Sequence, residues 1–310
     1  MRAVKTGVAK PHNARLTLLC LVLAMIFLWL ISDFAPRQYL KQQEKMPLNT
    51  TQITVSSNPD ATLIVRRATS TAVVDTTGMS AKEAKKAASR VAITTQTTIT
   101  RPQNNDMGPY LAILDNSQAQ LKYRLPVLEA TATSTIGFKD KPSVSSPHPV
   151  VRDGLEWIFP ANTAQQTYLF YDPIAQVSMP LDYAGKTKIH DLNAFVFAQE
   201  IAPMELTLPG LTPGTKYGVN REVVVEPKSG LIINISEKVQ VMRGNEAVVD
   251  TALEWDEKTQ TTQAMQAGKI IVRGQFLAAW SWLCRLAFIM LLAGVIREIR
   301  VLLKGAKINA

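Results

Sequence analysis

Residues 276–296 read FLAAWSWLCRLAFIMLLAGVI, an apolar run of 21 residues close to the C-terminal end of the sequence. A helix of about 20 such residues crosses the hydrocarbon core of a bilayer at a rise of about 1.5 Å per residue. A run in this position is not a cleaved signal peptide, which lies at the N-terminus. The sequence therefore predicts a transmembrane helix over 276–296, interrupted by one ionisable residue, Arg285.

A second apolar run, residues 16–32 (LTLLCLVLAMIFLWLIS), contains no charged residue. A signal peptide is the alternative interpretation of this run. Signal peptides end in a small-x-small cleavage site, whereas the residues that follow here, 33–37, read DFAPR. We therefore expect an uncleaved membrane anchor at 16–32, with Trp29 at the outer interface.

The net positive charge is concentrated at the two ends of the chain. Four of them precede the first run, and the chain from Arg285 onward carries a further net +4, which leaves +1 of the total +9 for the residues between. Segments rich in Lys and Arg stay on the cytoplasmic side of a membrane. We therefore expect both termini in the cytoplasm and the middle of the chain outside it, and we do not expect nucleic acid as a partner.

The predicted organisation is that of a two-span protein of the bacterial plasma membrane. Both cysteines, Cys20 and Cys284, belong to the apolar runs, so the exported part has no disulfide framework. The five expected parts are a cytoplasmic tail at 1–15, a transmembrane helix at 16–32, an extracytoplasmic β-rich domain at 33–275, a second transmembrane helix at 276–296, and a cytoplasmic or interfacial tail at 297–310.

The exported part is rich in Thr, Val, Ser and Ile, the residues favoured in strands. Residues 222–226 and 231–237 flank Pro227-Lys228-Ser229-Gly230, which predicts a hairpin. Residues 80–90 favour either a short helix or a hairpin tip, and 139–149 and 201–214 favour loops. The remaining expected strands cover 61–67, 70–76, 91–100, 111–115, 121–128 and 247–255. The predicted fold is a mostly β domain, sandwich or barrel-like, between two transmembrane helices.

Aromatic residues are concentrated between positions 153 and 199. Those at 157 and 159, and those at 195 and 197, alternate with other residues, which places each set on one face of a strand. They fit either a solid core or the lining of an apolar ligand cavity. Under the second interpretation the candidate ligand-binding residues are Trp157, Phe159, Tyr168, Phe170, Tyr171, Phe195 and Phe197.

Recognisable catalytic patterns are absent from the sequence. It holds three histidines and neither HExxH, GxSxG, GxxxxGK[ST] nor GxGxxG. We therefore assign no catalytic residue, no metal site and no cofactor. The one catalytic activity that we still consider is the cleavage of glycosidic bonds by a pair of carboxylates acting as acid and base. The carboxylates considered for it are Asp172, Asp182, Asp250, Glu254 and Asp256.

Of the residues in the second apolar run, Arg285 has the least favourable free energy of insertion into a membrane. A charge at the bilayer centre costs about 2.5–3.5 kcal/mol on insertion scales. The guanidinium can extend toward the headgroups beside Trp280 and Trp282. The alternative is a contact with an anionic lipid or with an intramembrane carboxylate. Because 16–32 holds no acidic residue, a protein partner would have to be another chain.

Three further segments lie in a fixed order between the apolar runs: DGLEWIFP at 153–160, TYLFYDP at 167–173 and VVVEPKSG at 223–230. Together with the two runs and the Thr-rich strands, they resemble the actinobacterial PorA-family membrane proteins over almost the whole chain. The resemblance implies a role in building the mycolic-acid-type envelope of corynebacteria and mycobacteria. It implies involvement in lipomannan and lipoarabinomannan maturation, or in the handling of trehalose mycolates, and it carries over no active-site residues.

From this resemblance we expect a non-enzymatic factor that binds or hands on an envelope lipid or lipoglycan in the periplasm, with a lipid transporter or a glycosyltransferase as partner. A scaffold subunit of an envelope-synthesis or transport complex is the first alternative, and a glycan-processing enzyme is the second. We do not expect a pore walled by strands, because such walls consist of alternating segments of about ten residues that face lipid.

Overall fold

The computed structural model describes residues 11–102, 109–128, 132–138 and 146–308. These residues form two compact units. One unit contains the described part of Met1–Gln42 together with that of Val272–Ala310, and the other is Gln43–Ile271.

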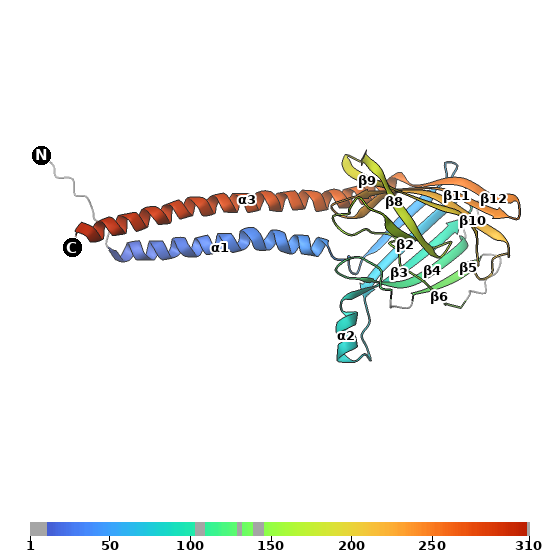
Figure 1. The fold of residues 1–310 in the computed structure, drawn as a ribbon, viewed down its shortest axis with the longest axis horizontal. Coiled ribbons are helices and arrows are strands. Elements are labelled where there is room, and N and C mark those ends of the chain that lie inside the picture. The colour runs from blue at the N-terminus through green and yellow to red at the C-terminus, as the bar shows by residue number, and fades with distance from the viewer. Residues whose placement is uncertain (1–10, 103–108, 129–131, 139–145, 309–310) are drawn as a thin grey trace. The chain divides into compact units, whose positions relative to one another are not determined.

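The first unit is helical. Helix α1 covers Pro11–Gln43, and helix α3 covers Glu257–Ile308 and begins in the second unit (Figure 1). Both helices are long and apolar enough to cross a membrane, and only 6% and 11% of their most apolar windows are buried. The predicted spans 16–32 and 276–296 therefore lie in helices.

Within this helical unit α1 and α3 contact one another. The guanidinium carbon of Arg273 lies 5.9 Å from the ring centroid of Tyr39. Buried or half-buried side chains recur every three or four residues, the spacing of one helix face. On α1 this face carries Leu18, Leu21, Met25, Leu28 and Ser32, and on α3 it carries Gly274, Leu277, Ser281, Cys284, Leu291 and Val295.

The second unit is built on an antiparallel sheet of twelve strands, in the order β6-β5-β4-β3-β2-β1-β12-β11-β10-β9-β8-β7. Strands adjacent in sequence pair with one another, apart from β6 and β7, and β1 also joins β12. The strands are β1 (Thr51–Ser57), β2 (Ile64–Val73), β3 (Arg90–Thr100), β4 (Pro109–Gln120), β5 (Ala132–Phe138), β6 (His148–Val150), β7 (Tyr168–Asp172), β8 (Val177–Ile189), β9 (Leu192–Glu205), β10 (Thr215–Glu226), β11 (Leu231–Arg243) and β12 (Glu246–Trp255).

The sheet curls so that one face of both halves surrounds a common interior (Figure 1). One apolar cluster joins residues of β4 and β5 to residues of β9–β12, including Ile113, Ile136, Ile201, Val219 and Val239. Alternation along each strand sends the other side chains to solvent. The outward positions are largely polar, and include Thr94, Gln96, Asn116, Gln120, Asn220, Glu222, Lys238 and Glu254. The fold class is therefore mostly β, as predicted.

The predicted hairpin is confirmed, since β10 pairs with β11 and the turn lies at 227–230. Residues 80–90 contain a helix, α2 (Ala81–Ala87). Ser80 caps its N-terminus through a capping box with Glu83, which satisfies two backbone donors and favours the helix over a hairpin tip.

Several predicted boundaries are wrong. The strands expected at 61–67 and 70–76 form one strand, β2. Residues 121–128 form turns instead of a strand, because Arg124 has a φ of 58° and its guanidinium bonds backbone oxygens of distant segments. The loop expected at 201–214 begins later, after β9 ends at Glu205. Part of the loop expected at 139–149 lies outside the described residues.

Residues 153–160 do not form the predicted period-two strand. They join the sheet only through isolated bridges, Leu155 to Phe170 and Ile158 to Leu231. Leu155 and Phe159 pack in one apolar cluster, whereas Trp157 packs in another beside Ala264 and Ala267 of α3. The apparent alternation therefore comes from a segment that crosses between two clusters.

Substitution of Gly230 tests this crossing. Gly230 has a φ of +72°, and a Cβ there would lie 2.3 Å from the carbonyl oxygen of Phe159. Gly244 has a φ of +60° with no atom within 4 Å of its Cβ position. We expect Gly244→Ala to cost about 1–2 kcal/mol for the positive φ alone. Gly230→Ala should cost about 1–3 kcal/mol more, because backbone must move.

Chemical unfolding of the full chain in detergent, followed by tryptophan fluorescence, measures both variants. Equal unfolding midpoints for the two variants would contradict the close packing of residues 153–160 on the hairpin turn.

Candidate functional site

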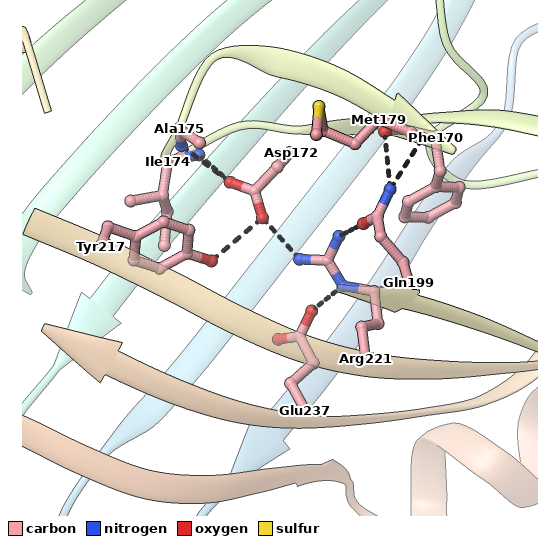
Figure 2. Close-up of polar contacts among 9 residues, drawn as sticks. All are labelled: Phe170, Asp172, Ile174, Ala175, Met179, Gln199, Tyr217, Arg221 and Glu237. Carbon is pink, nitrogen blue, oxygen red and sulfur yellow. Dashed lines mark hydrogen bonds and ion pairs between the residues drawn. The ribbon is translucent and has the colours of Figure 1, made fainter. Parts of the chain in front are cut away.

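Charged residues are buried inside the β domain at the end of β7. Asp172 is fully buried, and its Oδ2 lies 2.6 Å from Nη2 of Arg221 on β10 (Figure 2). The Nε of Arg221 donates to Glu237 on β11. Because truncating one partner of a buried ion pair leaves an uncompensated charge, each member requires the others.

Neutral groups complete the hydrogen bonding of this network. Tyr217 donates to Asp172 over 3.0 Å, and the backbone N–H groups of Ile174 and Ala175 each donate to its other oxygen over 2.8 Å. The Oε1 of Gln199 accepts from Arg221 over 2.7 Å (Figure 2). The amide nitrogen of Gln199 donates to carbonyl oxygens of Phe170 and Met179. The network thus ties β7 and β8 to β9, β10 and β11.

These contacts hold the network in its ionised form. Burial by itself raises the pKa of Asp172, but the charge of Arg221 and the donated hydrogen bonds outweigh it, so the pKa of Asp172 lies below its ordinary value. Burial and the adjacent carboxylate raise the pKa of Tyr217 well above its ordinary value. Tyr217 therefore acts as a hydrogen-bond donor at neutral pH.

A second buried cluster surrounds Arg152. Its Nη1 donates to Glu156, and its Nη2 lies 2.7 Å from Asp115, without the angle of a hydrogen bond. Its guanidinium carbon lies 3.9 Å from the ring centroid of Tyr171. Burial raises the pKa of Asp115 despite the nearby Arg152. Asp115 is therefore held less firmly in its charged form than Asp172.

A cavity of about 140 Å³ lies inside the β domain beside the Asp172–Arg221 network. Its wall is mostly aliphatic and includes Leu63, Ile99, Leu206, Leu208, Val239 and Leu253. Asp172, Tyr217, Arg221 and Glu237 also line it. The network therefore forms part of the wall of this cavity.

The seven predicted ligand-binding aromatic residues do not line this cavity. Five of them lie close together. Phe159 stacks on Phe197 and Phe170 at centroid distances of 5.3 and 6.3 Å, Tyr168 meets Phe159 edge-on at 5.3 Å, and Phe195 packs on the same apolar cluster. Tyr171 faces Arg152, and Trp157 lies in a separate cluster. Ligand binding by the seven remains untested.

The candidate carboxylates are dispersed. Asp172 belongs to the buried network, and Asp250 lies exposed on β12. Asp182, Glu254 and Asp256 line a surface groove of about 880 Å³. The described residues contain no group of three or more His, Cys, Asp or Glu side chains arranged to hold a metal ion.

Arg285 lies on the exposed side of α3. Its neighbour Cys284 is buried, together with Ser281 and Val295, so Arg285 lies about a quarter-turn from the face of α3 that packs within the helical unit. The guanidinium carbon of Arg285 lies 5.8 Å from the ring centroid of Trp282, one turn nearer the N-terminal end of α3. Arg285 is thus exposed at the flank of the packed face of α3.

The charge networks were missed because their partners lie far apart in the sequence. The sequence nevertheless contains a pattern that indicates buried charges. Tyr217, Val219, Arg221, Val223 and Val225 alternate along β10, so an arginine occupies an inward position among apolar residues. Asp115 holds the same kind of position after Leu111 and Ile113 on β4. A charge at an inward position predicts a buried partner, although it does not identify that partner.

The fold and these clusters define a mostly β protein with two long apolar helices and buried charges that satisfy one another. The chain belongs to the Porin PorA family, whose model matches residues 16–296. A protein of Corynebacterium resistens described as Porin PorA is 25% identical over 97 residues, which cover 31% of this chain and 24% of that protein. The match thus spans about a quarter of that relative's length.

The family confirms the predicted resemblance and indicates an envelope membrane protein. Its description as porins points to a channel and not to an enzyme, in agreement with the prediction that this chain is not an enzyme.

The same description overturns the predicted function. A porin is a channel-forming protein, whereas the sequence was interpreted as that of a factor handling lipids or lipoglycans. Neither the residues nor the comparisons support a role in lipid, lipoglycan or mycolate binding. The error arose because that role came from the resemblance and had no binding residue behind it.

The two buried carboxylates should respond differently to neutralisation. Asp172→Asn removes one of the two carboxylates that pair with Arg221, and we expect a loss of about 3–5 kcal/mol at pH 7. Asp115→Asn should cost less, because burial already disfavours the charge of Asp115. Chemical unfolding of the full chain at pH 7 measures both losses, and a larger loss for Asp115→Asn would contradict this ranking.

The pH dependence follows from the lowered pKa of Asp172. A carboxylate with a lowered folded-state pKa stabilises the fold above its unfolded pKa of about 4, and this contribution disappears as the pH falls through the folded value. We expect unfolding midpoints of the parent chain to fall below pH 4, and a flatter acid limb in Asp172→Asn. Parallel acid limbs would show that Asp172 is not the responsible group.

Proposed function

We propose that this chain is a two-span subunit of an oligomeric channel in the bacterial plasma membrane. In this proposal α1 and α3 cross the membrane at 16–32 and 276–296, both termini are cytoplasmic, and residues 33–275 are extracytoplasmic. The basic charge outside the two apolar runs supports this topology. The family description supports the channel.

The geometry favours a pore between helices over a pore through the sheet. A membrane barrel carries an apolar band on its outer face. Here the outward positions of the strands are largely polar, and the described interior is packed with apolar clusters and paired charges. Two helices cannot enclose a pore by themselves. A pore therefore requires several copies of the chain, joined through the exposed faces of α1 and α3.

Arg285 carries this proposal. Charged residues within spans almost always face a bundle interior or a water-filled cavity, because hydrocarbon solvates them poorly. Arg285 is exposed on α3, at the flank of the packed face, so in an assembly its guanidinium would lie at the pore or against a neighbouring copy. A ring of arginines favours anions in a pore. We therefore propose a channel that prefers anions, with one Arg285 from each copy at its constriction.

Cysteine labelling tests the topology. Asn245 lies exposed in the turn between β11 and β12, whereas Ala3 lies in the N-terminal tail. In intact cells a membrane-impermeant maleimide should label Asn245→Cys and should label Ala3→Cys only after the membrane is opened. The parent chain, with Cys20 and Cys284, is the control for background. Labelling of Ala3→Cys in intact cells would overturn the proposed orientation.

Recordings from planar bilayers test the pore. The purified full chain should conduct, and under a KCl gradient its current should reverse near the chloride equilibrium potential. Arg285→Gln should shift the reversal potential toward zero because it removes the ring of positive charge, whereas Arg285→Lys should retain the preference for anions. Arg297→Gln, outside the predicted span, is the matched control.

Either of two results would overturn the proposal. One is an absence of conductance from a chain that retains its fold. The other is an unchanged reversal potential in Arg285→Gln, which is expected if the guanidinium only reaches the headgroups beside Trp282.

A further inference from the structure

The 140 Å³ cavity of the β domain has a largely aliphatic wall, which also carries the Asp172–Arg221 network and a second polar pair, Arg67 and Thr97. The apolar part includes aliphatic side chains of β11, of β12 and of the loop after β9, which face β2–β5 across the interior. On β2 and β3 the cavity is lined by Arg67 and Thr97, which are directly paired in the sheet. This juxtaposition places a cation and a hydroxyl side by side on the cavity wall, in addition to the polar groups of the Asp172–Arg221 network.

The side chains of Thr97 and Arg67 can each form a further hydrogen bond. Thr97 is 1% exposed, and its Oγ1 has no hydrogen-bond partner among the described residues. The Nε of Arg67 is likewise buried without a hydrogen-bond partner there. A buried polar group without a hydrogen bond lowers the stability of the fold by about 1–3 kcal/mol. Such groups are therefore rare in native interiors. Thr95, two residues away on the same inner face, instead lies 3.3 Å from the hydroxyl of Thr69.

The charge balance of the lining favours an anion. Asp172 and Glu237 both pair with Arg221, which leaves one negative charge of this trio to be offset by the other arginines of the wall. The remaining charged residues of the lining are all arginines, Arg67, Arg101 and Arg243. Arginine binds carboxylate groups through charge-assisted hydrogen bonds, which are the stronger kind.

The volume limits the ligand to a small molecule. At about 30 Å³ for each water in the liquid, 140 Å³ corresponds to about five waters, and an apolar cavity of about 150 Å³ in another protein binds benzene. Pockets for drug-sized ligands are larger, about 300–1,000 Å³. An aromatic or branched aliphatic acid of about ten non-hydrogen atoms matches this size, whereas a long-chain lipid or a glycan does not.

We propose that this cavity is a binding site for a small organic acid, with its apolar body among the aliphatic residues and its carboxylate against Arg67 and Thr97. The site lies wholly within the β domain and is independent of the proposed pore and of Arg285.

Fluorine NMR on the purified full chain in detergent tests the site, with 4-fluorobenzoate as the probe. We expect saturable binding to the parent chain. Thr97→Val keeps the shape but removes the hydroxyl, and it should weaken binding at least tenfold, since a hydrogen bond to a charged group is lost. Thr97→Ser should bind within a few-fold of the parent chain, because it retains the hydroxyl.

Two controls separate the cavity from its surroundings. Thr95→Val makes the same change at a buried position that does not line the cavity, and it should bind like the parent chain. Val239→Phe adds bulk to the wall and should abolish binding. Equal binding by the parent chain, Thr97→Val and Val239→Phe would place the probe in the micelle or elsewhere and overturn the proposal, as would an absence of saturable binding to the parent chain.

Discussion

The ion pair between Asp172 and Arg221 is the contact on which the interior of the β domain depends. Asp172 ends β7, at the edge of the sheet, whereas Arg221 lies on β10, three strands away. Adjacent strands are separated by about 4.8 Å, so in a flat sheet these two strands would lie roughly 14 Å apart. The side chains meet at 2.6 Å only because β7 folds back over the inner face of its own sheet.

The bend that allows this lies in β8. Its first half, Val177–Leu181, pairs with β7, and its second half, Asp182–Ile189, pairs with β9, with a register shift between Tyr183 and Gly185. Register shifts of this kind bend a strand and increase its twist. Folding β7 inward buries Phe170 and Tyr171, but it also carries Asp172 into the interior, where a carboxylate is tolerated only when it is paired and hydrogen-bonded. Arg221, Tyr217 and two backbone N–H groups meet that requirement.

The helices and the β10–β11 turn could be predicted from the sequence, because each depends on residues that are close together in the chain. The two apolar runs predict helices because length and hydropathy alone decide them, and Pro227 and Gly230 predict the β10–β11 turn. Predictions failed where distant contacts decide the structure. Residues 121–128 have the composition of a strand but form turns around Arg124, and residues 153–160 alternate like a strand while crossing between two clusters. The buried cluster partners could not be predicted, because pairing of Arg221 with Asp172 depends on the bend in β8.

Arg124 differs from the other buried arginines in what surrounds it. Its guanidinium bonds the backbone oxygens of Lys45, Phe159 and Ser229 at 3.1, 3.1 and 2.6 Å, and that of Gln43 as well. All four acceptors are main-chain atoms, which every amino acid supplies. The residues at those four positions can therefore diverge without disturbing the contact, while Arg124 itself cannot. Comparison of related chains should then find an invariant arginine with no co-varying partner, a long-range contact that methods based on correlated substitutions would not detect.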